Sequence, residues 1–259
     1  MKFKTLIASV ALIALGTAVA GAADMPVRPA PLPPPVPVLN WTGLYAGVNI
    51  GGAWSNNTWT ETLFGTNFGN NGGNGAFIGG GQIGGNYQID HFVVGGEWDF
   101  DWAGSHNGPG VFIPGVGIVQ ISGHSRFITT VAARFGYAID QWLVYGKVGG
   151  GWVDNNNLSV TNLTTGVSVT CGTFTNFTNC NNNNSGGWLV GAGAEWAFAP
   201  HWSLKFEYDY LGLGNRTFTL PATSPIVALA GDTFTSGNRN VQMFKVGVNY
   251  LWNWGYNRY

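Results

Sequence analysis

Acidic and basic side chains recur at every second position in two stretches of this sequence. Residues 97–101 place Glu, Asp and Asp at alternate positions, and residues 205–209 place Lys, Glu and Asp in the same way. Paired carboxylates can perform acid–base catalysis, provided that a cleft, a nucleophile and an orienting group accompany them. Because the sequence offers no such constellation, we interpret these charges as structural salt bridges and predict no catalytic residue.

Histidine and cysteine give little indication of a metal or cofactor site. The four histidines are His91, His106, His124 and His201, and they show no ligand spacing. Cys171 and Cys180 are separated by eight residues, and no nearby histidine completes a zinc site. In an exported protein this pair predicts a disulfide. We predict neither a metal nor a cofactor.

The charged positions belong to elements with a side-chain period of two. In residues 201–210 the odd positions are His, Ser, Lys, Glu and Asp, whereas the even positions are Trp, Leu, Phe, Tyr and Tyr. A β-strand with this pattern has one ionic and one apolar face. Either water covers the ionic face of a soluble protein, or lipid covers the apolar face and the ionic face lines an interior.

Composition favours the second alternative. Charged residues make up 9% of the 259 residues, against about 25% in soluble domains.

Residues 1–22 have the basic start, apolar centre and small-residue end of a cleaved signal peptide. Residues 23–40 are rich in proline and predict a stiff periplasmic tether. Removal of Lys2 and Lys4 leaves nine basic residues against twelve acidic ones, so no basic excess indicates nucleic-acid binding.

The rest of the chain, residues 41–259, predicts a single all-β domain. No segment beyond residue 40 has 18 consecutive apolar residues. The period-two pattern predicts eight strands, at about 42–54, 77–89, 92–103, 122–138, 141–153, 186–199, 201–213 and 239–254. Two-residue turns alternate with long polar connections, which we expect to be external loops at about 55–76, 104–121, 154–185 and 214–238. This alternation is typical of an eight-stranded antiparallel up-and-down transmembrane β-barrel with short periplasmic turns.

Carrying the alternation through each strand assigns the charges to one face. The predicted ionic network of the barrel interior is Glu97, Asp99, Asp101, Arg126, Arg134, Lys147, Glu195, Lys205, Glu207, Asp209 and Lys245. A soluble lipocalin-like barrel would give the same alternation with its faces exchanged. However, the opposite face holds about twenty aromatic residues, too many for the interior of a small eight-stranded barrel.

Aromatic residues on the apolar face recur at an interval of ten residues, as in Phe77 and Tyr87. In tilted strands, ten residues rise by about 25 Å, the height of the apolar band of such barrels. We therefore predict two aromatic girdles at the membrane interfaces. Their members are Phe77, Tyr87, Phe92, Trp102, Phe127, Tyr137, Trp142, Trp152, Trp188, Phe198, Trp202 and Tyr210.

The chain resembles the alphaproteobacterial outer-membrane immunogenic protein family, small porin-like β-barrel surface antigens. The resemblance rests on residues 40–52 (NWTGLYAGVNIGG), 22–26 (AADMP), 191–195 (GAGAE) and 245–250 (KVGVNY). It implies an eight-stranded barrel in the Gram-negative outer membrane, in contact with lipid and inserted by the barrel-assembly machinery. The final strand ends either at Trp254 or at Tyr259, the terminal aromatic that such barrels use as an assembly signal.

We therefore expect a non-enzymatic structural barrel that displays surface loops and contributes to envelope integrity. Two alternatives remain open. The first is a small passive channel, although side chains fill most of the lumen of an eight-stranded barrel. The second is a loop-borne binder of haem or of a host or environmental ligand, a role that relatives in the resembled family suggest.

Overall fold

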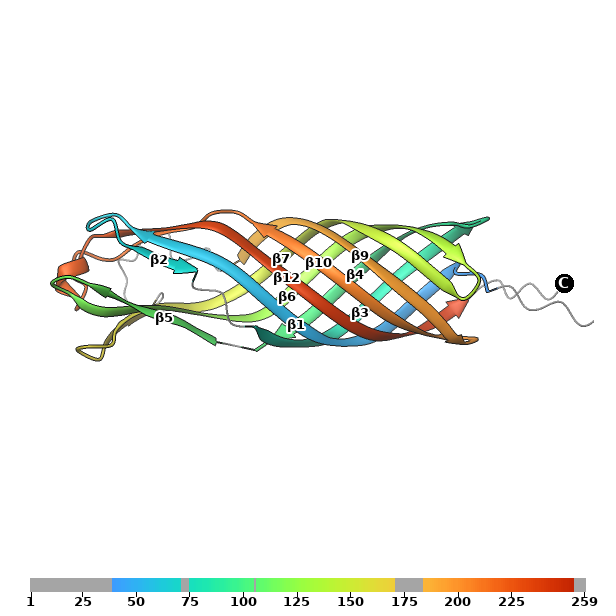
Figure 1. The fold of residues 1–259 in the computed structure, drawn as a ribbon, viewed down its shortest axis with the longest axis horizontal. Helices are drawn as coiled ribbons and strands as arrows, with labels where there is room; N and C mark the ends of the chain where they lie inside the picture. Colours follow the sequence, from blue (N-terminus) through green and yellow to red (C-terminus); the bar gives the residue numbers. More distant parts are fainter. Residues whose placement is uncertain (1–38, 71–74, 105, 171–183, 254–259) are drawn as a thin grey trace, which may run out of the picture. The chain divides into compact units, whose positions relative to one another are not determined.

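In the computed structural model of the protein, eight long antiparallel strands form a closed barrel (Figure 1). The structure describes residues 39–70, 75–104, 106–170 and 184–253. The barrel strands are β1 (Gly43–Glu61), β3 (Ala76–Ile89), β4 (Phe92–Ala103), β6 (Gly117–Ile139), β7 (Trp142–Asn162), β9 (Asn184–Ala199), β10 (Trp202–Leu213) and β12 (Thr233–Asn253). Each strand pairs with its neighbour in sequence order, and β12 pairs with β1 to close the ring. The predicted fold class is confirmed.

Three two-residue turns join the strands at one end of the barrel, as predicted. They lie between β3 and β4, β6 and β7, and β9 and β10. In the first two turns Asp90 and Asp140 adopt left-handed backbone conformations, with φ of 54° and 50°. Asp tolerates this region because its short side chain can hydrogen-bond to nearby backbone. The peptide oxygen of the second turn residue accepts a hydrogen bond from a backbone N–H group of an adjacent strand. For example, the N–H of Ala138 on β6 donates to the peptide oxygen of His91 at 2.7 Å.

At the opposite end, the strands continue well past their predicted limits. β1 reaches Glu61, whereas the sequence predicted an end near residue 54, and its pairing with β12 extends to Phe234. These extensions are rich in Asn, Thr and Gly, so they lack the period-two hydrophobic signal from which strands are predicted. Backbone pairing continues the sheet there, and a few buried apolar side chains, such as Trp59 and Phe234, pack inside it.

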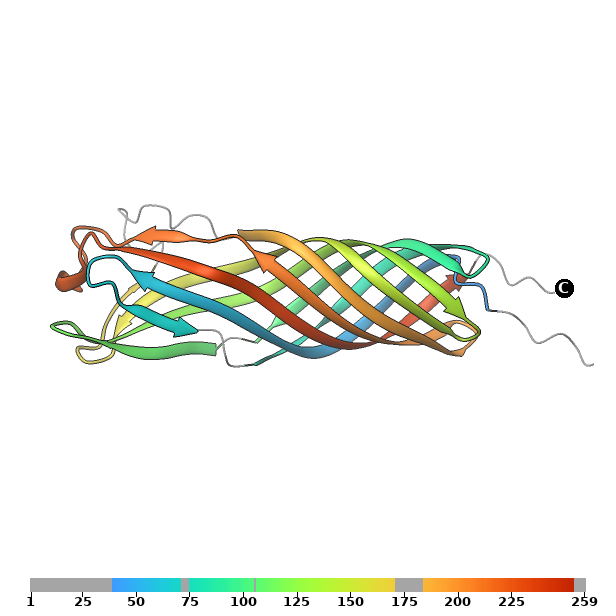
Figure 2. The same ribbon diagram turned by 45° about the horizontal axis from the view of Figure 1, so that its top comes forward.

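Much of the four predicted external connections is therefore folded. They contain the short strands β2 (Asn67–Asn70), β5 (His106–Ile113), β8 (Val167–Thr170) and β11 (Thr217–Thr219), together with the 3₁₀ helix η1 (Val227–Leu229). Each short strand pairs antiparallel with a barrel strand that extends into this region. Figure 2 shows these segments together at the end opposite the short turns. We call this part of the molecule the head.

The described part of the interior contains three apolar clusters. The first, near the short turns, includes Trp41, Leu143 and Leu251. The second lies farther along the strands and includes Ile78, Leu189 and Met243. The third fills the head with Trp59, Phe68, Ile113, Val119, Ile121, Val160, Val169, Phe218, Leu220, Ile226, Leu229 and Phe234. Charged and amide side chains occupy the interior between the first and second clusters.

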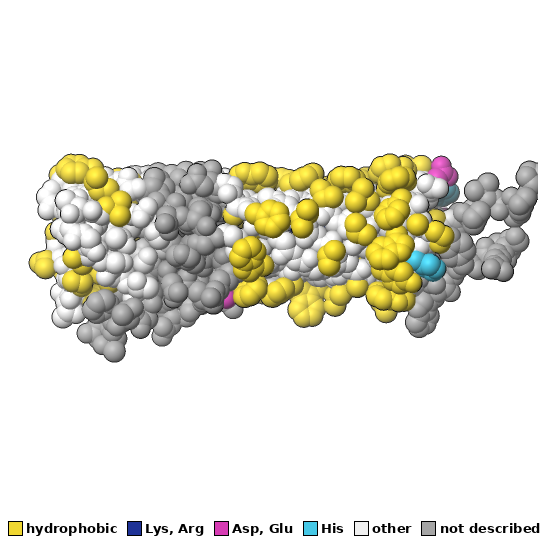
Figure 3. Space-filling view, turned by 90° about the horizontal axis from the view of Figure 1, so that it is seen from below, with side chains coloured by type: hydrophobic (Ala, Val, Ile, Leu, Met, Phe, Trp, Pro, Cys, Tyr) yellow, Lys and Arg dark blue, Asp and Glu magenta, His cyan; other side chains and the backbone are white. Residues whose placement is uncertain are grey.

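The outer wall of the barrel is apolar. Hydrophobic side chains gather over the half of the wall that leads to the short turns (Figure 3). Beyond Trp54, Phe77, Trp102 and Trp152 the described surface is mainly polar, and exposed apolar side chains return at the tip of the head, as at Phe112. No described helix has the length and hydropathy needed to span a membrane.

Several predictions concern residues outside the described ranges. The predicted signal peptide and all but the last two residues of the tether lie within residues 1–38, and Cys171 and Cys180 also lie outside. In the structure β12 ends at Asn253, close to the shorter of the two predicted ends, and residues 254–259 are not described.

We predict that the head has a core whose stability depends on Phe234. This side chain is fully buried, stacks on Phe218 at 5.0 Å and lies 5.9 Å from Phe68. Substitution Phe234→Ala should cost about 3–5 kcal/mol of head stability, the usual loss for a buried Phe. Protease should then cleave the head in proteoliposomes, while the barrel keeps its heat-dependent mobility in gels.

The matched control is Phe112→Ala, since Phe112 lies on the surface of the head with 67% of its area exposed. This variant should resist protease as the wild type does. Equal resistance of the Phe234→Ala head would show that this cluster does not hold the head together.

Candidate functional site

The structure brings ten of the eleven predicted interior charges into one network. They are Glu97, Asp99 and Asp101 on β4, Arg134 on β6, Lys147 on β7, Glu195 on β9, Lys205, Glu207 and Asp209 on β10, and Lys245 on β12. All ten are buried, with at most 3% of their surface exposed. The side chain of Arg126 lies outside what the structure describes.

Lys147 lies among carboxylates from two different strands. Its Nζ is 2.7 Å from Glu97 and 3.1 Å from Asp99, both on β4. On β10 it is 3.0 Å from Glu207 and 3.7 Å from Asp209. Since β7 is not hydrogen-bonded to β4 or to β10, these contacts cross the barrel interior and connect strands that the sheet does not pair.

Lys245 makes a similar set of contacts from β12. Its Nζ is 2.9 Å from Asp209, 3.1 Å from Asp99 and 3.1 Å from Glu207. Lys205 contributes a third ammonium group, 3.2 Å from Glu97. Three lysines thus share the same carboxylates, so the network is continuous and not a set of separate pairs.

Arg134 forms the end of the network nearer the short turns. It pairs with Glu97 at 3.2 Å and with Glu195 at 2.9 Å, and it also donates to the hydroxyl of Tyr45. The guanidinium lies 3.8 Å from the ring centre of Tyr145, a cation–π contact in a buried setting. Arg suits this position because its planar group can make several directed hydrogen bonds while stacking on an aromatic ring.

Neutral side chains add hydrogen bonds to the glutamates of the network. The Tyr45 hydroxyl donates to Glu97 and the Tyr145 hydroxyl to Glu207, each at 2.7 Å. Asn249 donates to Glu195 at 2.7 Å. Such additional bonds are what a buried ion pair needs to offset the cost of removing both charges from water.

The carboxylates of the network on β4 and β10 are paired with lysine ammonium groups. Oxygens of Glu97, Asp99 and Glu207 lie within 4.8 Å of one another, close enough to hold a cation. The ammonium groups of Lys147 and Lys205 already lie at 2.7–3.5 Å from these oxygens, so protein amines occupy the place of a cation. The full burial of Asp99 and Lys205 also separates the carboxylates from any solvent-borne substrate.

Tyr45 and Tyr145 are members of the network that our sequence analysis missed. Their positions carried a signal, since Tyr45 has the same parity as Asn49 and Tyr145 the same parity as Lys147. The predicted network contains only charged side chains and therefore does not include these two phenols. The side-chain parity of a strand is thus a better guide to its faces than residue type.

The predicted girdle residues lie on the outer wall. Ten of the twelve are exposed by 44% or more, namely Phe77, Tyr87, Phe92, Trp102, Tyr137, Trp142, Trp152, Trp188, Phe198 and Trp202. Phe127 and Tyr210 are half-buried because each packs on an outer-wall ring, Phe100 at 5.0 Å and Trp188 at 5.3 Å. His91 and His201 stack on Tyr137 and Tyr250 at the short-turn end.

A second pair of carboxyl groups, unrelated to the network, lies in the head. Glu61 and Asp232 are buried and interact through their side chains. Burial, together with the adjacent Glu61, raises the pKa of Asp232 to about 6. Burial also opposes ionisation of Glu61, but N–H groups of Phe64 and Thr66 donate to it and hold its pKa below its usual range. No periodicity in the sequence indicated this pair.

A closed barrel with an apolar wall and an ionic interior is the architecture of an outer-membrane β-barrel protein. The sequence matches the family described as "Outer membrane protein beta-barrel domain" over residues 9–251. It is 30% identical to the 31 kDa outer-membrane immunogenic protein of Brucella melitensis biotype 1, over 95% of this chain and 98% of the relative. The 25 kDa outer-membrane immunogenic protein of the same organism is 27% identical, over 95% and 96% of the two chains.

Among solved structures, the outer-membrane protein OprG of Pseudomonas aeruginosa is similar at 10% identity, with a TM-score of 0.47. The similarity covers 82% of this chain and 98% of OprG. On the sequence relationships, the chain belongs to the outer-membrane β-barrel family that includes the outer-membrane immunogenic proteins. Its location is the Gram-negative outer membrane, with lipid around the barrel.

We predict that Lys245→Met strongly destabilises the barrel. The substitution removes the ammonium group that lies 2.9 Å from Asp209 and 3.1 Å from Asp99, and both carboxylates are fully buried. Removal of one partner of a buried ion pair typically costs about 3–5 kcal/mol. Urea unfolding in lipid vesicles, followed by tryptophan fluorescence, should show a correspondingly lower midpoint.

The control is Phe244→Leu, one residue earlier on the same strand but on the lipid face, where 45% of the Phe side chain is exposed. Its midpoint should stay close to the wild-type value. A wild-type midpoint for Lys245→Met would contradict the structural role assigned to the network.

We also predict that the head loses stability as pH rises from about 5 to 7. The protonated form of Asp232 is favoured in the folded head, so its contribution is present below the unfolded pKa of about 4 and is lost as pH passes through about 6. Of the roughly two units between the unfolded and folded pKa values, about one lies above pH 5, so the loss between pH 5 and 7 is about 1.4 kcal/mol. Resistance of the head to protease, measured across this pH range, should therefore decrease.

Asp232→Asn imitates the protonated carboxyl and should make protease resistance nearly independent of pH over the same range. The Glu61 carboxyl, whose pKa is lowered, titrates below this range and does not alter the trend. If the protease resistance of Asp232→Asn decreased with rising pH as it does in the wild type, the decrease would arise from a group other than Asp232.

Proposed function

We propose that this protein is a non-conducting, non-enzymatic structural barrel that displays a folded head on the cell surface and contributes to envelope integrity. The observation that carries this proposal is the full burial of the ionic network. Asp99, Lys205 and Lys245 point into the barrel interior and have no exposed surface. A water-filled lumen would leave charged side chains at this level in contact with solvent.

The apolar clusters on either side of the network support the same conclusion. Leu143 and Leu251 are buried on the short-turn side, and Leu189 and Met243 are buried on the side of the head. A solute crossing the barrel would have to displace both clusters as well as the salt bridges. The alternative of a passive channel is therefore disfavoured relative to a closed barrel.

The head supports a role in surface interaction. At its tip Phe112 pairs with Ile118 across the β5–β6 hairpin, and the N–H of Leu163 bonds to the Ile118 peptide oxygen at 2.7 Å. These three side chains are exposed by 67%, 42% and 49%, respectively. Exposed apolar side chains that adjoin one another are typical of binding surfaces. We infer that a host or environmental ligand binds the head and not the barrel interior.

Bilayer conductance tests the proposal directly. Purified protein, shown to be folded by its heat-dependent gel mobility, should give no conductance steps above background in planar bilayers. A general porin reconstituted in the same membranes supplies the positive control. Reproducible steps from the folded protein would overturn the closed-barrel proposal and favour the passive channel.

A further inference from the structure

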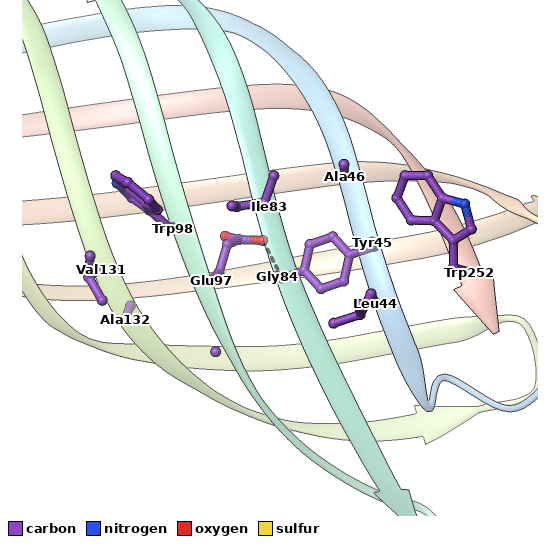
Figure 4. A pocket seen from close by; sticks show the side chains of 11 residues that line it. Leu44, Tyr45, Ala46, Ile83, Gly84, Glu97, Trp98, Val131, Ala132 and Trp252 are labelled. Carbon is purple, nitrogen blue, oxygen red and sulfur yellow. Dashed lines mark hydrogen bonds between the residues drawn. The ribbon is translucent and has the colours of Figure 1, made fainter. Parts of the chain in front are cut away.

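An apolar groove lies on the outer wall of the barrel, where β1, β3, β4 and β6 run side by side (Figure 4). Its volume is about 690 Å³. Leu44, Ile83, Trp98, Val131 and Trp252 border it with apolar side chains. Tyr45 and Glu97 also border it, but these two hydrogen-bond to each other and leave the groove apolar.

The groove exists because small residues interrupt the bulky outer face. Gly96 on β4 lies directly opposite Gly85 on β3 and Ala133 on β6, so no side chain larger than a methyl group projects there. The adjoining row consists of Ile83, Trp98 and Val131, which are also direct cross-strand partners. These three side chains form one wall of the groove.

The position of the groove identifies the lipid that faces it. Leu44 and Trp252 pair with each other near the start of β1 and the end of β12, at the end of the barrel that carries the short turns. In outer-membrane barrels the short turns are periplasmic. Trp98 lies six residues beyond Phe92, the first residue of β4, which corresponds to a rise of about 15 Å. The groove therefore spans about one leaflet, the periplasmic one.

We propose that this groove binds one acyl chain of a glycerophospholipid from the periplasmic leaflet of the outer membrane. The groove is continuous with the lipid-facing wall, on which Val48, Phe92 and Phe135 are exposed by 56–68%. Lipid is thus already in contact with its borders. A flexible chain fills a narrow apolar groove without leaving polar groups unpaired, and no hydrogen-bonding partner is required there.

The bound chain also covers the position where the barrel closes. Leu44 and Trp252 belong to β1 and β12, the two strands whose pairing completes the ring. An acyl chain that contacts Leu44, Trp252 and the neighbouring β3 and β4 adds apolar contacts across this closure. We therefore assign to the lipid a stabilising role at the junction between the first and last strands.

Native mass spectrometry with dioleoylphosphatidylethanolamine tests the proposal. Delipidated wild-type protein should bind a first phospholipid molecule more tightly than any further phospholipid molecules. Gly96→Leu fills the groove from its floor, and it is sterically tolerated because the nearest atom to an added Cβ, the Ala132 peptide oxygen, is 3.8 Å away. Affinity for the first lipid should fall about tenfold or more, as expected when two or more methylenes lose their burial.

The matched control is Gly146→Leu on β7. Gly146 also faces outward, and its added Cβ would likewise meet only a peptide oxygen at 3.8 Å, that of Gly191. It does not border the groove. This variant should bind the first phospholipid as the wild type does. Equal affinities of the wild type and Gly96→Leu, or an equal loss in both glycine variants, would overturn the proposal.

The same titration distinguishes other occupants. If the protein bound lipid A in preference and Gly96→Leu weakened this binding, the bound lipid would come from the outer leaflet. If the wild type formed a dimer that Gly96→Leu abolished, the occupant of the groove would be a second copy of this chain. Either result would overturn the proposal. Heat-dependent gel mobility establishes that each variant is folded. If Gly96→Leu does not fold, Ala46→Leu fills the same groove from β1 and should reduce the first binding step in the same way.

Discussion

The whole structure depends on the requirement that backbone N–H and C=O groups in hydrocarbon find partners within the protein. Pairing of β12 with β1 satisfies this requirement, since it leaves no unpaired strand edge in the ring. Closure with eight strands then fixes a narrow interior, which side chains must fill. The low charge content, the alternating faces and the burial of ionic groups all follow from this constraint.

The narrow interior explains why so few charges form so dense a network. Six carboxylates and four basic groups lie together in the interior, and three lysines share Asp99 and Glu207. In a low-dielectric interior an unpaired charge is costly. Each lysine of the network accordingly contacts at least three carboxylates. The network joins β4, β7, β10 and β12 across the interior, and it therefore fixes the barrel against deformation in ways that backbone pairing cannot.

The membrane-spanning part could be predicted from the sequence because side-chain parity is strict there. One face meets lipid and the other meets charge, so a residue such as Lys147 has a single possible side once its strand is recognised. The head follows no such rule. Residues 55–61 pair with β12 through their backbone, and the contacts of Trp59 with Phe218 join segments far apart in sequence. Likewise, the Glu61–Asp232 pair and the lipid-facing groove arise from cross-strand register, which one sequence does not reveal.

The barrel strands continue well beyond the part that faces the apolar band of the membrane. β6 has 23 residues and β7 has 21, about twice the number needed to cross the apolar band. The additional residues carry the tip roughly 25 Å above the bilayer surface. Because paired strands continue into this region, the tip stands on a stiff support and not on flexible tethers. Its apolar side chains are therefore held at a fixed distance from the apolar band of the barrel.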